Sequence, residues 1–178
     1  MTGVLALDQA TVTGWAHSEP GQTPTWGHID LAKSGVGMGK VGAAFSIFLE
    51  ARIAVFRPQF VIYETPFIGG GRIPINPLTL RRLLGIAGLI DTICEQRGIE
   101  CREAGSLAFT KFFTGQGRFE DRQAKKRATM ERCKMLGWEC SEDEADAVAL
   151  LLYAEAKLFP RYAMARPAGP LFSPERAA

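Results

Sequence analysis

Short apolar runs that end in an acidic residue occur twice along the chain. Residues 3–8 (GVLALD) end at Asp8, and residues 59–64 (QFVIYE) end at Glu64. Continuous apolar runs of this length are typical of buried strands. Because ligands bind at the carboxyl ends of strands in open α/β sheets, both acids are candidate site residues.

Three further segments have strand character. Residues 13–18 and 25–31 flank the turn-forming stretch EPGQTP, which predicts a hairpin with a longer loop. Together with residues 3–8 they form a predicted antiparallel meander. A last short strand is predicted at residues 99–104 (IECREA).

Helical periodicity predicts five helices, over residues 40–56, 77–97, 106–113, 122–137 and 142–158. Pro77 suits the first position of the second helix, Gly98 its C-terminal cap, and Ser106 an N-cap of the third. The apolar positions that recur in the first two helices are Val41, Phe45, Phe48, Leu49 and Phe56, then Leu80, Leu83, Leu84, Ala87 and Ile90.

The order of these elements predicts the fold class. Three antiparallel strands come first, and the later strands return through helices, which indicates an α/β fold with a mixed sheet and helices on both faces. We expect one domain over residues 1–158. The tail, residues 159–178, contains Pro160, Pro167, Pro170 and Pro174, and we expect it to be loosely held.

Composition fits a globular protein, since hydrophobic residues make up 47% and charged residues 22% of 178. The apolar runs are too short to span a membrane, and the N-terminus lacks the features of a signal peptide, so we expect a soluble, cytoplasmic protein. The cysteines form two C-x6-C pairs, wider than the spacing usual in structural zinc sites, which favours buried thiols over zinc.

Basic residues are concentrated in two segments, although the net charge is only +2. Residues 72–82 contain three arginines and no acid, and residues 111–134 contain eight lysines or arginines against three acids. Two such segments indicate a basic face suited to nucleic acid. A solvated helix surface is the alternative interpretation.

The last predicted helix poses a problem of burial. Ser141 and Glu144 match a capping box, and acids in a first helical turn suit the helix dipole, so Asp143 has a structural explanation. Asp146 lies past that turn, on the face shared with Ala147 and other apolar residues. A buried carboxylate needs a partner. The candidates are a buried Lys or Arg, a hydrogen bond to the sheet, or a metal ion shared with the other acids.

Magnesium suits the metal hypothesis, because it prefers carboxylate oxygens together with water and phosphate oxygens. Two such ions, about 4 Å apart, stabilise the attacking and leaving oxygens of a phosphodiester. A nuclease that acts on DNA requires an acidic metal site surrounded by basic residues that bind the phosphate backbone.

Three segments, taken together, resemble the acidic motifs of the RuvC-like Holliday junction resolvases in the ribonuclease H-like superfamily. The segments are VLALDQATVTGWA, FVIYETPF and DEADAVALLLYAEA, within a resemblance that covers roughly residues 3–158. The short chain and its GWECSEDEADAVALL ending look most like bacteriophage or prophage members.

The resemblance implies a mixed five-stranded sheet, with three antiparallel strands followed by parallel ones, flanked by helices. It implies a homodimer that cuts two opposing strands of a four-way DNA junction, leaving 5′-phosphate and 3′-hydroxyl ends. It also implies two Mg²⁺ ions, with Mn²⁺ as a substitute. The catalytic and metal-holding residues would be Asp8, Glu64, Asp143 and Asp146; some relatives have histidine where this chain has Asp143.

The resemblance extends to residues that contact DNA. Phe67 occupies the place of an aromatic that stacks on junction bases in relatives, and packing onto the core is its alternative role. The segment FTGQGRFEDRQAKKRA resembles the basic loop and helix of the family, in which a lysine contacts the scissile phosphate. The candidate DNA-binding residues are Phe67, Arg72, Arg81, Arg82, Arg118, Arg122, Lys125 and Lys126. The loop IGGGRIPINP departs from the bacterial host enzymes, so their sequence preference is not carried over.

Other functions stay open at this point. The stretch LDQATVTGW also looks like the phosphate loop of actin-like ATPases and sugar kinases, but those proteins need two such domains. A junction-binding protein that does not cut would be marked by loss of a carboxylate, and all four are present. A broader branched-DNA or flap nuclease and a ribonuclease H remain alternatives, because the sequence does not show junction geometry.

Overall fold

A single mixed sheet organises the computed structural model, which describes residues 3–31, 36–68 and 76–161. The strand order is β3-β2-β1-β4-β5. β1, β2 and β3 are antiparallel, whereas β4 and β5 run parallel to β1, as the element order predicted. The strands are β1 (Val4–Asp8), β2 (Val12–Ser18), β3 (Thr25–Asp30), β4 (Phe60–Glu64) and β5 (Glu100–Ala104).

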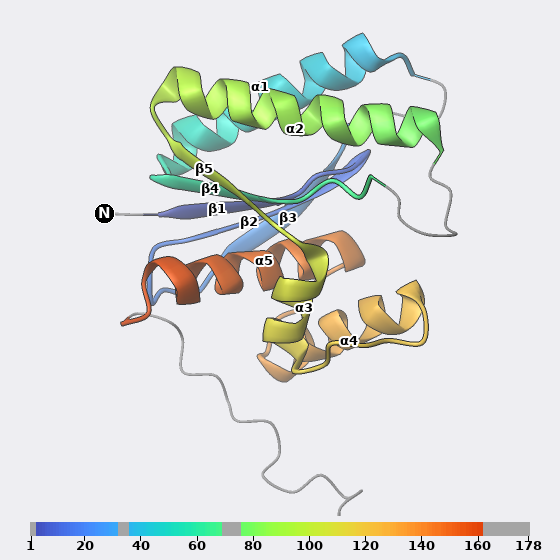
Figure 1. Cartoon of the computed structure of the whole chain (residues 1–178). Coiled ribbons are helices and arrows are strands. Elements are labelled where there is room, and N and C mark those ends of the chain that lie inside the picture. The colour runs from blue at the N-terminus through green and yellow to red at the C-terminus, as the bar shows by residue number, and fades with distance from the viewer. Residues whose placement is uncertain (1–2, 32–35, 69–75, 162–178) are drawn as a thin grey trace, which may run out of the picture.

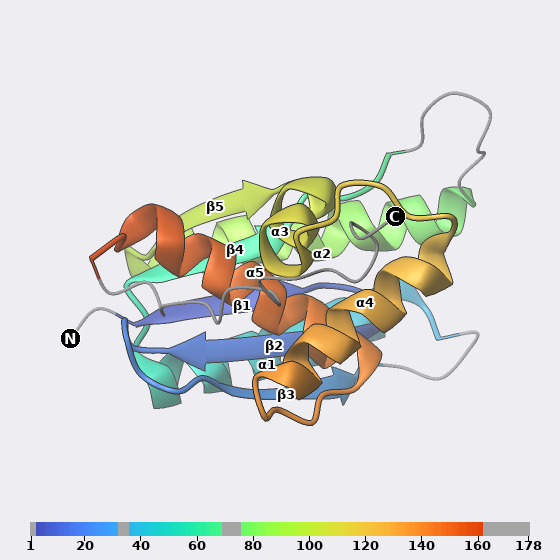
Figure 2. The same ribbon diagram turned by 90° about the horizontal axis from the view of Figure 1, so that it is seen from below.

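Helices cover both faces of the sheet (Figure 1). One layer contains α1 and α2, and the other contains α3, α4 and α5, with α5 crossing the sheet and α3 and α4 beside it (Figure 2). The helices are α1 (Met38–Phe56), α2 (Pro77–Arg97), α3 (Ser106–Thr114), α4 (Arg122–Met135) and α5 (Glu142–Leu158). None of those described is long and apolar enough to cross a membrane.

Strand alternation divides the interior into two cores. Leu5 and Leu7 pack under α1 and α2, whereas Val4 and Ala6 pack under α5. Asp8 follows Val4 and Ala6 at intervals of two, so its side chain belongs to the α5 face. The same parity holds in β4, where Ile62 packs on the α5 side and Glu64 follows it. Both strand-end acids therefore lie on the face that α5 covers.

Helix ends match the sequence signals at most positions. Asn76 accepts a hydrogen bond from the Leu78 amide at the start of α2, and Gly98 ends this helix in a left-handed conformation. The N-cap predicted at Ser106 is wrong, because Gly105 occupies that place and Ser106 is the first helical residue. The Ser106 hydroxyl instead accepts a hydrogen bond from Lys125 Nζ at 2.5 Å. A tertiary contact thus takes the oxygen that a cap would have used.

The four cysteines lie on both sides of the sheet. Cys94 and Cys101 pack in the core under α1 and α2, and Cys133 and Cys140 pack in the core under α5. Cys94 and Cys133 are buried thiols, as predicted, whereas Cys101 and Cys140 are partly exposed, and the sheet separates the two pairs. Of the apolar positions that recur in α2, Ala87 and Ile90 are buried, whereas 48% of the surface of Leu84 is exposed.

Candidate active site

Asp8 and Glu64 end neighbouring parallel strands. The ladder between β1 and β4 pairs Val4 with Phe60 and ends where Leu7 pairs with Tyr63. The two acids come directly after this last pair, at the same edge of the sheet and on the same face. Burial is the main cause of the raised pKa of Asp8, and the Glu64 carboxyl group lies close enough to Asp8 to help raise it. The sheet topology therefore brings together two residues 56 positions apart in the sequence.

Helix α5 brings Asp143 and Asp146 to this edge. Its first turn is fixed by the predicted capping box, in which the Glu144 carboxylate accepts a hydrogen bond from the Ser141 amide at 2.8 Å. The helix lies directly on β2 at Gly14, which pairs with Asp8. A Cβ atom at Gly14 would lie 2.0 Å from the Asp143 carbonyl oxygen. The absence of a side chain at this position lets the acidic turn approach the sheet.

The proximity of the carboxyl groups is visible in the electrostatics of Asp8. Its pKa lies well above the usual value for an aspartate. Burial is the main cause, and the carboxyl groups of Glu64, Asp146 and Asp143 add to it. The carboxyl group of Asp8 therefore interacts with those of the other three predicted acids, and this concentration of negative charge favours a bound cation.

Asp146 is the most deeply buried of the four, at 5% exposed. Burial raises its pKa, and Lys125, whose Nζ lies 3.7 Å from Oδ2, opposes that shift. Its other oxygen, Oδ1, is buried and accepts no hydrogen bond from the part of the chain that the structure describes. Lys125 is therefore one of the partners that the sequence led us to expect for Asp146, and the neighbouring acids are those with which Asp146 would share a metal ion.

Lys126 occupies the corresponding place beside Asp143. Its Nζ lies 2.6 Å from a Glu142 oxygen and 3.7 Å from a carboxylate oxygen of Asp143. Burial lowers the pKa of Lys126, but the two acids outweigh that effect and raise it overall. Lys125 and Lys126 are the two candidates for the lysine that contacts the scissile phosphate. Lys125 lies beside Asp146, and Lys126 lies beside Asp143.

The residues at this site fit a hard divalent cation. All four side chains supply carboxylate oxygens, which Mg²⁺ and Mn²⁺ prefer. The partnerless Asp146 oxygen is an available ligand, and a cation would relieve the repulsion that raises the pKa of Asp8. Among the described residues, no three His, Cys, Asp or Glu side chains are already arranged around one ion position. Lys125 and Lys126 compensate part of the negative charge of the four carboxyl groups.

The predicted DNA-contacting residues lie in several places. Phe67, just beyond Glu64, is 54% exposed. Arg81 is exposed on α2, whereas Arg82 donates a hydrogen bond to the Val36 carbonyl at 3.1 Å. Arg72 lies outside the described residues.

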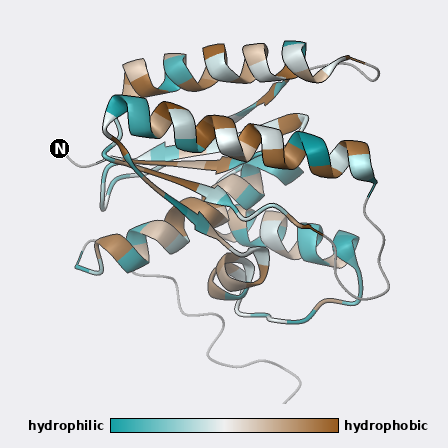
Figure 3. Ribbon diagram, turned by 45° about the horizontal axis from the view of Figure 1, so that its top comes forward, coloured by the Kyte–Doolittle hydropathy of each residue, from teal (hydrophilic) through white to brown (hydrophobic). Residues whose placement is uncertain are grey.

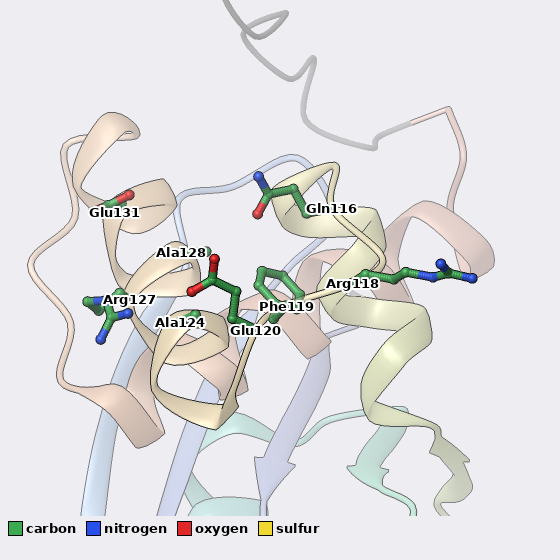
Figure 4. Close-up of a pocket in the computed structure, with 8 residues that line it drawn as sticks. All are labelled: Gln116, Arg118, Phe119, Glu120, Ala124, Arg127, Ala128 and Glu131. Carbon is green, nitrogen blue, oxygen red and sulfur yellow. The ribbon is translucent and has the colours of Figure 1, made fainter.

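Arg118 and Arg122 are exposed in the loop before α4 and at its first turn. Arg118 also lines a hollow of about 350 Å³ that the sequence did not predict. Figure 4 shows Phe119 among the residues that line this hollow, with the Arg118 side chain extending away from them. The lining residues are Gln116, Arg118, Phe119, Glu120, Ala124, Arg127, Ala128 and Glu131.

Sequence reasoning also missed Gln9. Its side chain is only 4% exposed, and its Nε2 donates a hydrogen bond to the Glu64 carbonyl oxygen. Its position directly after Asp8 was visible in the sequence. No pattern in a single chain shows, however, that this amide points toward the neighbouring strand.

The strand order, the two helical layers and the acids at the ends of β1 and β4 define a RuvC-like, ribonuclease H-like α/β fold. Two Thermus thermophilus RuvC structures share it, each with a TM-score of 0.66. One, in complex with a Holliday junction substrate, is 12% identical, and the match covers 86% of this chain and 92% of that one. The other structure is 14% identical, and the match covers 89% of this chain and 97% of that one.

The yeast mitochondrial Holliday junction resolvase Ydc2 has the same fold. Its TM-score is 0.57 at 13% identity, and the match covers 90% of this chain and 82% of that one. No family model and no curated protein matches the sequence. The similarity to these structures therefore establishes the fold, while the residues of the site have to support the function.

Proposed function

We propose that this protein is a metal-dependent endonuclease that resolves four-way DNA junctions by paired nicks. The main support is the group of four interacting carboxyl groups on β1, β4 and α5, with Lys125 and Lys126 beside it. The similarity of the fold to structures of Holliday junction resolvases supports the choice of substrate.

The side chains of the site have separate roles in this proposal. Asp8, Glu64, Asp143 and Asp146 would hold Mg²⁺ or Mn²⁺, and a cation bound there would activate water and stabilise the charge of the transition state. Water attacks the phosphorus, the bond to the 3′ oxygen breaks, and that oxygen leaves as a hydroxyl, with the phosphate on the 5′ end. Lys125 and Lys126 provide positive charge for the non-bridging phosphate oxygens.

The DNA is held by residues around this edge. Exposed Phe67 stacks on unpaired bases at the junction centre, and the basic residues Arg81, Arg118 and Arg122 contact phosphates. A four-way junction has two equivalent strands to cut, so two copies of the site are needed. We therefore include a homodimer in the proposal.

Cleavage assays with labelled substrates test this function. A four-way junction, splayed arms, duplex DNA and an RNA–DNA hybrid are each incubated with Mg²⁺ or Mn²⁺. We expect symmetric, ligatable nicks in the junction. Asp146→Asn should reduce the rate by more than about 100-fold, because it removes a metal-holding oxygen. Glu95→Gln, which changes an exposed acid on α2, should cut normally.

The other substrates distinguish the alternatives. Cutting of splayed arms as well as junctions would indicate a broader branched-DNA or flap nuclease, and cutting of the hybrid alone would indicate a ribonuclease H. A junction that is bound but not cut with either metal would contradict the proposal and indicate a binding protein. Circular dichroism of Asp146→Asn checks that lost activity does not reflect lost structure.

A further inference from the structure

The side chain of Gln9 links the two strands that carry the first two acids. It is 4% exposed, and its amide nitrogen donates to the backbone carbonyl of Glu64. This carbonyl can only accept, so the nitrogen and not the oxygen of the amide must face it. Gln9 lies next to Asp8, which places the contact at the base of the carboxylate group.

This hydrogen bond continues the sheet beyond its last backbone pair. The β1–β4 ladder ends at Leu7 and Tyr63, and the side chain of Gln9 supplies the next link across the strands. On the other side of β4, the Thr65 amide donates to the Ala104 carbonyl at 2.9 Å. The end of β4 is thereby held from both neighbouring strands at the position of Glu64.

Half of this buried amide is left without a partner. Gln9 Oε1 is buried and has no hydrogen-bond partner among the described residues. Burial of an unsatisfied polar atom costs free energy, so an apolar side chain of similar length would serve packing better. A role that needs the donating nitrogen accounts for a glutamine at this place.

We propose that Gln9 is a positioning residue for the metal-holding carboxylates, an inference that rests on the proposed function. Its amide fixes the backbone of Glu64 relative to Asp8, and so sets the spacing of the two carboxyl groups. Without the amide, the end of β4 is held only from the β5 side. The two carboxylates then have to be ordered when the cation binds, which weakens binding.

Gln9→Met tests this inference, because methionine has a similar length and no donor. Gln96→Met is the matched control. Gln96 is exposed near the C-terminus of α2, next to the start of β5 and at the opposite end of the strands from the candidate site. Mn²⁺ binding is measured by electron paramagnetic resonance, and the metal concentration for half-maximal junction cleavage is measured with Mg²⁺. Thermal unfolding in EDTA reports the stability of the metal-free fold.

We expect Gln9→Met to weaken Mn²⁺ binding by about 10-fold and to raise the half-saturating Mg²⁺ concentration similarly, as for other residues that support metal ligands. Its cleavage rate at saturating metal should recover to within about 3-fold of wild type. Metal binding within 2-fold of wild type would contradict the role of Gln9 alone. Wild-type protein that neither binds Mn²⁺ nor cuts would overturn the proposed function and this inference together.

If Gln9→Met unfolds in EDTA, Gln9→Asn provides the second measurement. Asparagine keeps the donor on a shorter side chain, so the hydrogen bond to Glu64 is stretched and the polar character is retained. Weaker Mn²⁺ binding by Gln9→Asn, with an unchanged unfolding temperature, would support the positioning role. Unchanged Mn²⁺ binding by the same variant would contradict it.

Discussion

Helix α5 contains two buried carboxyl groups in different surroundings. Asp146 lies among acids and beside Lys125, whereas Glu155, 1% exposed, accepts a hydrogen bond from the Ser18 hydroxyl. Ser18 pairs with Val4 at the opposite edge of the sheet, far from the candidate site. Burial raises the pKa of Glu155, and the hydrogen bond from Ser18 only partly offsets it. The folded state is therefore more stable when Glu155 is protonated than when it is ionised.

Glu155→Gln should change how stability depends on pH. Because the folded state binds the proton more tightly than the unfolded state, the contribution of Glu155 is complete below its usual pKa and is lost as pH rises through the raised value. The glutamine variant does not titrate. Its free energy of unfolding should equal that of wild type near roughly pH 4 and exceed that of wild type near roughly pH 8.

Urea unfolding of both proteins across this pH range measures the difference in their free energies of unfolding. The contributions of the other carboxyl groups are the same in both proteins and cancel from this difference. Ser18→Ala serves as the matched control for loss of the hydrogen bond alone. A difference between Glu155→Gln and wild type that stays constant with pH would contradict the assignment of a raised pKa to Glu155.

At the scale of elements, the contact between α5 and β2 decides whether the site exists. The helix is rich in alanine on its buried side, and this allows its backbone to lie close to the sheet. The closest approach is at Gly14, below the turn that contains Asp143. The position of that turn, and with it two of the four acids, depends on a residue without a side chain.

Gly14→Ala should therefore damage both stability and activity. The new methyl group would lie 2.0 Å from the Asp143 carbonyl oxygen, so α5 must move away from β2. We expect a loss of about 2 kcal/mol in free energy of unfolding and of about 100-fold in junction cleavage. Chemical unfolding and single-turnover cleavage measure the two effects.

Gly88→Ala is the control, because it makes the same substitution at a position where the added methyl group has space. Gly88 lies within α2, and an added Cβ there meets no atom within 4 Å. Because alanine favours helices, this variant should gain about 0.5 kcal/mol and cut normally. Equal behaviour of the two alanine variants would show that the α5–β2 approach does not constrain the site.

At the scale of the whole molecule, the layer formed by α1 and α2 presents an outer apolar surface. It consists of Ile47 and Val55 on α1 and Leu78 and Leu84 on α2, each between 48% and 73% exposed. Figure 3 shows hydrophobic segments recurring along both helices. Large apolar side chains that are exposed in a monomer can become buried at interfaces between proteins. This surface is our candidate for the contact in the proposed homodimer.

The double variant Ile47→Lys with Val55→Lys tests that candidate. Two buried charges without partners would oppose association, so the dimer should dissociate while the monomer stays folded. Light scattering with size-exclusion chromatography should give about twice 19.4 kDa for wild type and 19.4 kDa for the variant. Met135→Lys, an exposed apolar position on α4, is the control. A wild-type mass of one chain would contradict the homodimer.

The sequence determined the elements and their order, because these depend on local periodicity, turns and caps. The bounds predicted for the helices at 77–97 and 142–158 are those of α2 and α5. The sequence also identified Asp146 as anomalous, since a carboxylate on an apolar helical face needs a partner wherever that face packs. The exposure of Leu84 could not be read from the sequence, because periodicity identifies an apolar helical face but not how much of that face a neighbouring element covers.

Only the tertiary structure decided how the acids interact. The parallel pairing of β1 with β4 places Asp8 beside Glu64, and the packing of α5 adds Asp143 and Asp146. These contacts join positions far apart in the chain, so no local signal encodes them. The hydrogen bond from Gln9 to the Glu64 carbonyl also required the folded chain, because a side-chain contact across strands depends on strand order and register.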